Sequence, residues 1–67
     1  MKASELTKRE QQVLALLADG LAHDEIAERL GIGSETVRTH IRQAMDKLDA
    51  DTRTQAVARA LRDRLIA

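Results

Sequence analysis

Apolar residues recur at helical spacing in four segments of the chain, and short polar or glycine-containing breaks separate the segments. A spacing of three and four residues places apolar side chains on one face of a helix. The pattern therefore predicts an all-α fold, a tetrahelical domain with helices at about residues 8–19, 23–30, 34–48 and 53–65.

Capping signals support these bounds. Thr7 and Glu10 match the capping box Ser/Thr-x-x-Glu/Gln, and Thr52 and Gln55 repeat it before the last segment. Gly20 follows the first segment at a position where helices commonly end in the left-handed conformation. Glu10 is interpreted either as the capping-box residue or as the partner of a basic group in the fold.

The second and third segments are separated only by residues 31–33, a short turn with a glycine at each end. Two short amphipathic helices joined by three or four residues form a helix-turn-helix unit, predicted here at about residues 22–41. In such a unit the second helix lies in the DNA major groove and its N-terminal residues reach the base edges.

Charge distribution is more informative than net charge. The chain carries 11 basic and 11 acidic residues, so its formal net charge is zero. Within the third segment, however, Arg38 and Arg42 are one helical turn apart and share a face. The planar fork of arginine can donate two hydrogen bonds to guanine O6 and N7.

Composition excludes several other classes. The chain has no cysteine and no aromatic residue, so it offers no disulfide, no thiolate metal site and no ring on which single-stranded bases could stack. Histidine and carboxylates at 23–28 lack metal-ligand spacing, and no nucleophile–base pair is present. We expect neither an enzyme nor a metal, cofactor or small-molecule site. With no long apolar run, we expect a cytoplasmic protein without a membrane span.

Six fragments resemble one family in order and at the family's spacings. They are LTKRE at 6–10, VLALLADGL at 13–21, EIAERLGI at 25–32, TVRTHI at 36–41, KL at 47–48 and RTQAVARA at 53–60. Together they make the chain similar to the LuxR/FixJ/GerE-type DNA-binding domain of bacterial transcription regulators. The resemblance covers nearly all of residues 1–67, which we interpret as a single domain.

This resemblance implies sequence-specific binding of double-stranded DNA at promoters, as a homodimer that uses the fourth helix; RNA polymerase is a further candidate partner. By position, the family's base-reading residues fall on Arg38, Thr39 and Arg42. The other DNA-contacting positions correspond to Ser34, Thr36, Val37 through its main chain, and Lys47.

The fourth segment carries more apolar surface than one core requires. Its apolar residues spread over roughly 200° of arc, whereas a helix on a single core needs about 100°. We therefore predict that Ala58, Leu61 and Leu65 meet a second copy of the chain in a self-complementary contact.

The sequence departs from the family pattern at four helix ends. Ala22 and Gly33 stand where the family usually has a capping serine, and Asp49 and Arg64 stand where it usually has glycine. These differences leave open how the helix at 23–30 begins, how the loop before the helix at 53–65 is shaped and how that last helix ends.

Two alternatives remain at this stage. Region four of a bacterial sigma factor shares an LTxRE-like helix and TVR, but does not need the fourth helix. A protein-interaction adaptor could keep the fold without binding DNA, which would suit the neutral charge. The chain could be a stand-alone regulator or the effector end of a longer one.

Overall fold

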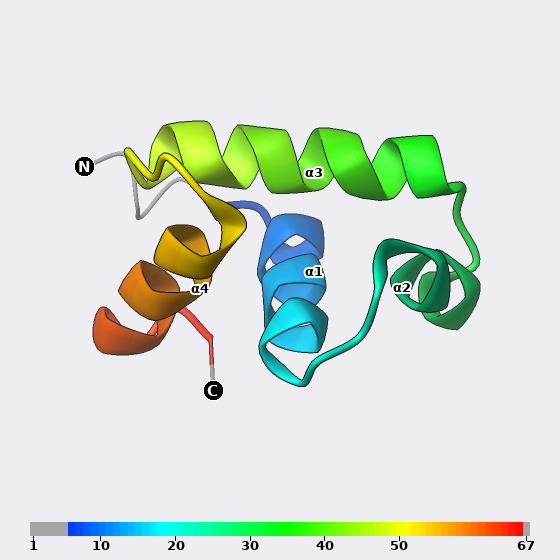
Figure 1. The fold of residues 1–67 in the computed structure, drawn as a ribbon, viewed down its shortest axis with the longest axis horizontal. Coiled ribbons are helices and arrows are strands. Elements are labelled where there is room, and N and C mark those ends of the chain that lie inside the picture. Colours follow the sequence, from blue (N-terminus) through cyan, green and yellow to red (C-terminus); the bar gives the residue numbers. More distant parts are fainter. Residues whose placement is uncertain (1–5, 67) are drawn as a thin grey trace.

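A computed structural model describes residues 6–66 and shows four helices and no strand within that range. The helices are α1 (Lys8–Ala18), α2 (His23–Leu30), α3 (Ser34–Lys47) and α4 (Arg53–Arg62). In Figure 1, α3 runs along one side of the molecule, with α2 under its N-terminal end, α1 under its middle and α4 under its C-terminal end. The predicted all-α, four-helix fold is confirmed.

Helix α1 lies between two apolar clusters that together form the core. One cluster joins α1 to the C-terminal half of α3 and to α4, through Leu6, Leu14, Ala44, Leu48, Ala56 and Ala60. The other joins α1 to α2 and the N-terminal half of α3, through Val13, Ile26, Ala27, Val37 and Ile41. Leu17 and Met45 pack against both clusters, so the core is continuous along α3.

Small side chains allow this core to close without any aromatic residue. Ala44, Ala56 and Ala60 are completely buried where α3 meets α4. The distance between packed helices depends on the side chains at the contact, so alanines let these two helices approach closely.

Both capping threonines act as predicted, but of the two predicted capping boxes only the first forms in full. The Glu10 N–H donates to Thr7 Oγ1 at 3.0 Å, and the Thr7 N–H donates to Glu10 Oε1 at 2.9 Å. At α4 the Gln55 N–H donates to Thr52 Oγ1 at 3.1 Å. The Gln55 side chain instead accepts from the Asp51 N–H at 2.7 Å, one residue before the position that the box requires.

The turn between α2 and α3 depends on Gly31. This residue has a φ of 69°, which is the left-handed conformation that glycine adopts at no steric cost. The next N–H, of Ile32, donates back to the Ala27 carbonyl at 3.0 Å, and the Ile32 side chain packs against the core. Gly33 then begins α3 with no side-chain cap. The turn therefore holds α2 and α3 in a helix-turn-helix arrangement.

Helix α4 is shorter than predicted. It ends at Arg62 rather than at residue 65, because Arg64 takes a φ of 60° and turns the chain back. The Leu65 N–H donates to the Ala60 carbonyl at 2.8 Å, and Leu65 and Ile66 pack against the core. Helices α1 and α3 each end one residue earlier than expected.

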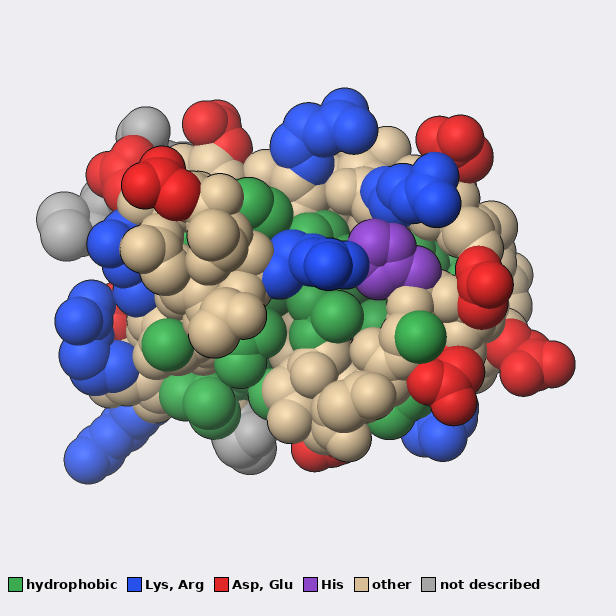
Figure 2. All heavy atoms as spheres, viewed as in Figure 1, with side chains coloured by type: hydrophobic (Ala, Val, Ile, Leu, Met, Phe, Trp, Pro, Cys, Tyr) green, Lys and Arg blue, Asp and Glu red, His purple; other side chains and the backbone are tan. Residues whose placement is uncertain are grey.

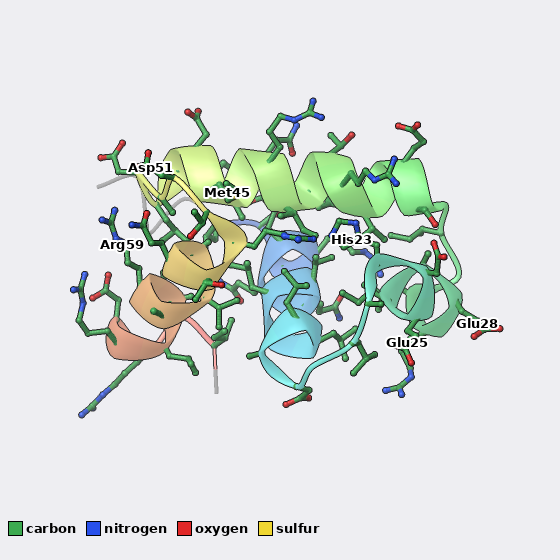
Figure 3. All side chains as sticks on the ribbon, viewed as in Figure 1. His23, Glu25, Glu28, Met45, Asp51 and Arg59 are labelled. Carbon is green, nitrogen blue, oxygen red and sulfur yellow. The ribbon has the colours of Figure 1, made fainter. Side chains whose placement is uncertain are left out.

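The connection from α3 to α4 is fixed by a similar turn. Asp49 has a φ of 55°, and the Ala50 N–H donates to the Met45 carbonyl at 2.9 Å. Arg59, labelled in Figure 3, donates through Nη1 to the carbonyls of Leu48 and Asp49, and so ties α4 to the end of α3. Among residues 6–66, Asp49 and Arg64 are the non-glycine positions with positive φ, and they are the two positions at which the resemblance led us to expect glycine.

Candidate nucleic-acid interface

One edge of α3 is anchored in the core while the other faces solvent. Val37 and Ile41 are buried, and Arg38, Thr39 and Arg42 are exposed. Figure 2 shows basic side chains along α3 near the upper edge of the face in view and another below them beside a histidine, with further ones at the left margin near α4; carboxylates lie mainly toward the margins. The three residues expected to read bases therefore lie together on one exposed edge.

Arg38 is held only weakly by its neighbours. Its Nη1 lies 4.0 Å from Glu35 Oε2, and the two side chains are 58% and 93% exposed. A surface ion pair of this kind contributes about 0–1 kcal/mol. The guanidinium can therefore leave Glu35 for a ligand at little cost.

Thr39 is oriented by the helix itself. Its hydroxyl donates to the Glu35 carbonyl at 3.1 Å, one turn earlier in α3. The hydroxyl hydrogen is thus occupied, whereas a phosphate oxygen needs a donor. In this rotamer Thr39 presents a methyl group and an acceptor rather than a phosphate-binding donor.

The residues at the start of α3 differ in whether their polar groups are available to contact DNA. Thr36 is exposed, whereas the Ser34 hydroxyl donates to Asp24 Oδ1 at 2.8 Å and joins the starts of α2 and α3. The Val37 side chain is fully buried, and its N–H donates to the Gly33 carbonyl at 3.1 Å. Val37 therefore anchors α3, and its main-chain donor is already used inside the helix.

Lys47 lies away from this edge, in an ion pair with α1. Its Nζ donates to both carboxylate oxygens of Glu10, at 2.8 and 3.1 Å. The side chain of Glu10 is only 2% exposed, and that of Lys47 27%. Burial alone would raise the pKa of Glu10, but the hydrogen bonds from Lys47 and from the Thr7 N–H bring this pKa below its ordinary value. Glu10 is therefore both the capping-box residue and the partner of a basic group.

A second group of basic side chains adjoins the α3 edge, and the sequence did not single it out. Arg53, the first residue of α4, donates from Nη1 to His23 Nε2 on α2 at 2.6 Å. Both line a shallow groove beside α3, formed by His23, Arg38, Ile41, Arg42, Met45, Asp51, Thr52 and Arg53. Figure 3 shows His23, Met45 and Asp51 around this groove, whereas Glu28 points away from it.

This groove is cationic, because Arg38, Arg42 and Arg53 line it against one carboxylate, Asp51. Burial, together with the charges of Arg53 and Arg38, lowers the pKa of His23 below its ordinary value. Arg53 also stands at the N-terminal end of a helix, where the dipole disfavours a cation. This unfavourable placement was the signal available in the sequence, where Arg53 appeared only as the first residue of the RTQAVARA fragment and was given no role in DNA binding.

The residues expected at a dimer contact separate into two environments. Ala58 is exposed and Leu61 is 44% exposed, and both line a mainly apolar groove between α4 and the end of α1, whose polar members include Arg53 and Thr54. Leu17, Ala18 and Leu21 form the α1 side of that groove. Leu65 instead packs partly against the chain's own core, because the chain turns back after α4.

Residues 6–66 offer neither a metal-binding cluster nor a membrane-spanning helix. No cluster of three or more histidine, cysteine or acidic side chains within this range has a geometry that could hold a metal ion. None of the helices described there has the length and apolar character needed to cross a bilayer.

Comparison with known proteins places this geometry in a family. The sequence profile of the GerE domain, described as bacterial regulatory proteins of the luxR family, matches residues 4–60. The transcriptional regulatory protein LiaR of Bacillus subtilis (strain 168) is 48% identical over 61 residues, which cover 91% of this chain and 29% of LiaR. The regulator MalT of Yersinia pestis (strain Pestoides F) is 42% identical over 62 residues, which cover 92% of this chain and 7% of MalT.

Solved structures of bacterial regulators have the same fold. The transcription factor GerE superposes with a TM-score of 0.89 at 34% identity, and the match covers 92% of each chain. The response regulator ChrA of a heme-sensing two-component system gives a TM-score of 0.87 at 39% identity, over 91% of this chain and 30% of ChrA. The chain spans less than a third of LiaR and of the YxjL protein of the same bacterium.

The profile match extends into α4 as far as residue 60, which favours this family over region four of a sigma factor. The folded arrangement, with α2 and α3 as the helix-turn-helix pair, is that of GerE. This chain therefore belongs to the luxR family of bacterial regulatory proteins, and its four helices are the family's helix-turn-helix DNA-binding domain.

Proposed function

We propose that this domain binds double-stranded DNA in a sequence-specific manner, with α3 in the major groove, and that it does so as a dimer within a cytoplasmic transcription regulator. The observation that carries the proposal is the edge formed by Arg38, Thr39 and Arg42, which is exposed on a helix whose other side is buried. A helix fixed in this way can enter the groove without rearrangement of the fold.

The chemistry of each residue supports a separate role. Arg38 and Arg42 each carry a guanidinium that can bind guanine O6 and N7, a contact that discriminates against a wrong base by about 1–3 kcal/mol. Thr39 presents its methyl group, which fits the C5 methyl of thymine. Thr36 is exposed near the helix start, in reach of the DNA backbone.

Two positions expected to contact DNA take other roles in this proposal. The Ser34 hydroxyl is engaged by Asp24, and the Lys47 ammonium by Glu10. We assign both to holding α3 in place, so that their effect on DNA binding passes through the position of the helix.

Dimerisation would use the apolar groove beside α4. Ala58 and Leu61 are exposed there, and a copy related by two-fold symmetry would bring the same residues to the contact. Because one domain presents few phosphate-neutralising groups, two half-sites acting together would give the affinity and specificity that one lacks.

Selection of duplexes from random DNA, followed by fluorescence anisotropy at two salt concentrations, tests the proposal. We expect salt-dependent binding to the selected duplex, and we expect Arg38→Ala or Arg42→Ala to reduce the preference for it over a scrambled duplex. Arg62→Ala, at the far end of α4, is the control and should leave this preference unchanged. Absence of binding at low salt would instead favour the adaptor that keeps the fold without DNA binding.

A further inference from the structure

The Arg53–His23 pair lies outside the helix-turn-helix edge, yet it belongs to the same surface. Arg53 comes from α4 and His23 from α2, and their side chains meet at 2.6 Å beside α3. The groove that they line also contains Arg38 and Arg42. Three arginines from two helices thus converge on one shallow depression, with Asp51 as its acidic member.

We propose that Arg53, positioned by His23, binds a phosphodiester group of the DNA backbone that borders the major groove read by α3. This inference rests on the proposed DNA binding of α3 and extends the interface to α4. The first residue of α4 would thus contact the DNA backbone, while other residues of the same helix pack in the core.

The position of the groove favours backbone phosphate over base edges as the ligand. Arg38 and Arg42 line the groove from α3, whereas Arg53 lines it from α4, a helix that does not enter the major groove in the proposed complex. A helix inserted in the major groove has a phosphate backbone on either side of it, so a cationic groove alongside the helix faces that backbone. The guanidinium fork of Arg53 matches two oxygens of one phosphate.

His23 explains how Arg53 is aimed. An arginine is always a donor, so His23 Nε2 must be the acceptor and the imidazole is neutral in this pair. One N–H of Arg53 is thereby used to orient the side chain across the groove, and the remaining N–H groups are left to donate. Arg53 is otherwise exposed, so it contributes little to the core.

Arg62 provides a matched control for this role. It is also an exposed arginine of α4, nine residues further along the helix. That separation is about 13 Å along the axis and about half a turn around it, so Arg62 points away from the groove. Replacing either arginine with alanine removes the same charge from the same helix.

The test measures binding of fluorescent duplexes, both selected and scrambled, by wild-type protein and by Arg53→Ala, Arg53→Lys and Arg62→Ala over a range of salt concentrations. We expect Arg53→Ala to lose about tenfold in affinity on both duplexes alike. The salt slope should fall by about 0.9, the value for one phosphate contact. Arg53→Lys should retain the slope, and Arg62→Ala should match wild type. Circular dichroism confirms that each variant is folded.

Ethylation interference then locates the contact. A backbone phosphate whose ethylation weakens wild-type binding but not that of Arg53→Ala would be the predicted partner. Equal binding by Arg53→Ala and Arg62→Ala would overturn the inference while leaving the proposed function intact. A changed base preference of Arg53→Ala, together with an unchanged salt slope, would also overturn the inference. Wild-type protein that binds no duplex would instead overturn the proposed function, and this inference with it.

Discussion

Replacing Lys47 with methionine should destabilise the fold strongly, although this residue was first identified as a DNA contact. Methionine retains much of the apolar stem and removes the ammonium, so Glu10 loses both hydrogen bonds from Lys47 Nζ. The buried carboxylate of Glu10 would then keep the hydrogen bond from the Thr7 N–H and the electrostatic influence of His40, but no ion-pair partner in contact with it.

The magnitude follows from that burial. Removing one partner of a buried ion pair typically costs about 3–5 kcal/mol, because a desolvated charge is left behind. The 27% exposure of Lys47 indicates that water reaches this site. We therefore expect a cost of about 3 kcal/mol, at the lower end of that range. A domain of this length has a total stability of about 3–10 kcal/mol, so the variant should be close to unfolding or clearly weakened.

Urea unfolding followed by circular dichroism at the helix band is the suitable assay, since the chain has no aromatic residue for fluorescence. Lys8→Met, an exposed lysine at the start of α1, is the control and should lie within about 0.5 kcal/mol of wild type. The double variant Glu10→Gln with Lys47→Met should recover much of the loss, because no buried charge remains.

The dependence of the free energy of unfolding on pH gives a second test of the Glu10–Lys47 pair. In the folded protein the pKa of Glu10 is lowered, so its contribution to stability is present above its ordinary pKa of 4.5 and is lost as the pH falls through the folded value. Without Lys47, burial should raise this pKa instead, so the gap between wild type and Lys47→Met should narrow as the pH drops from 7 toward 4. A loss below about 0.5 kcal/mol at pH 7, or a double variant no more stable than the single one, would refute the role given to the pair.

Three further predictions concern other parts of the molecule. Arg64→Gly should raise the free energy of unfolding by about 1 kcal/mol, because φ is 60° there; a thermal midpoint at or below that of wild type would contradict this. His23 has a lowered pKa, from burial and from Arg53 and Arg38, with Asp24 acting in the opposite sense. Stability should therefore decline as the pH falls below 6.5 in urea titrations, and His23→Gln should show a smaller decline. Leu61→Glu should weaken self-association on DNA in analytical ultracentrifugation while leaving the helical content unchanged, because Leu61 is 44% exposed.

Local signals in the sequence were sufficient to predict the four helices and the turn between α2 and α3. The apolar period, the capping threonines and the glycines act over a few residues, so their effect can be predicted without the rest of the fold. The end of α4 was the exception, since no glycine marks it. Only the packing of Leu65 and Ile66 on the core made the left-handed turn at Arg64 favourable.

The roles of the charged residues depended on contacts between helices. The sequence by itself determined that Arg38, Thr39 and Arg42 share one side of α3, because their spacing is helical. Only the tertiary structure decided that Lys47 faces Glu10, 37 residues earlier, and that Arg53 meets His23, 30 residues earlier. Such pairs are set by the way α1, α2 and α4 pack against α3, and helical periodicity carries no information about which side chains meet across that packing.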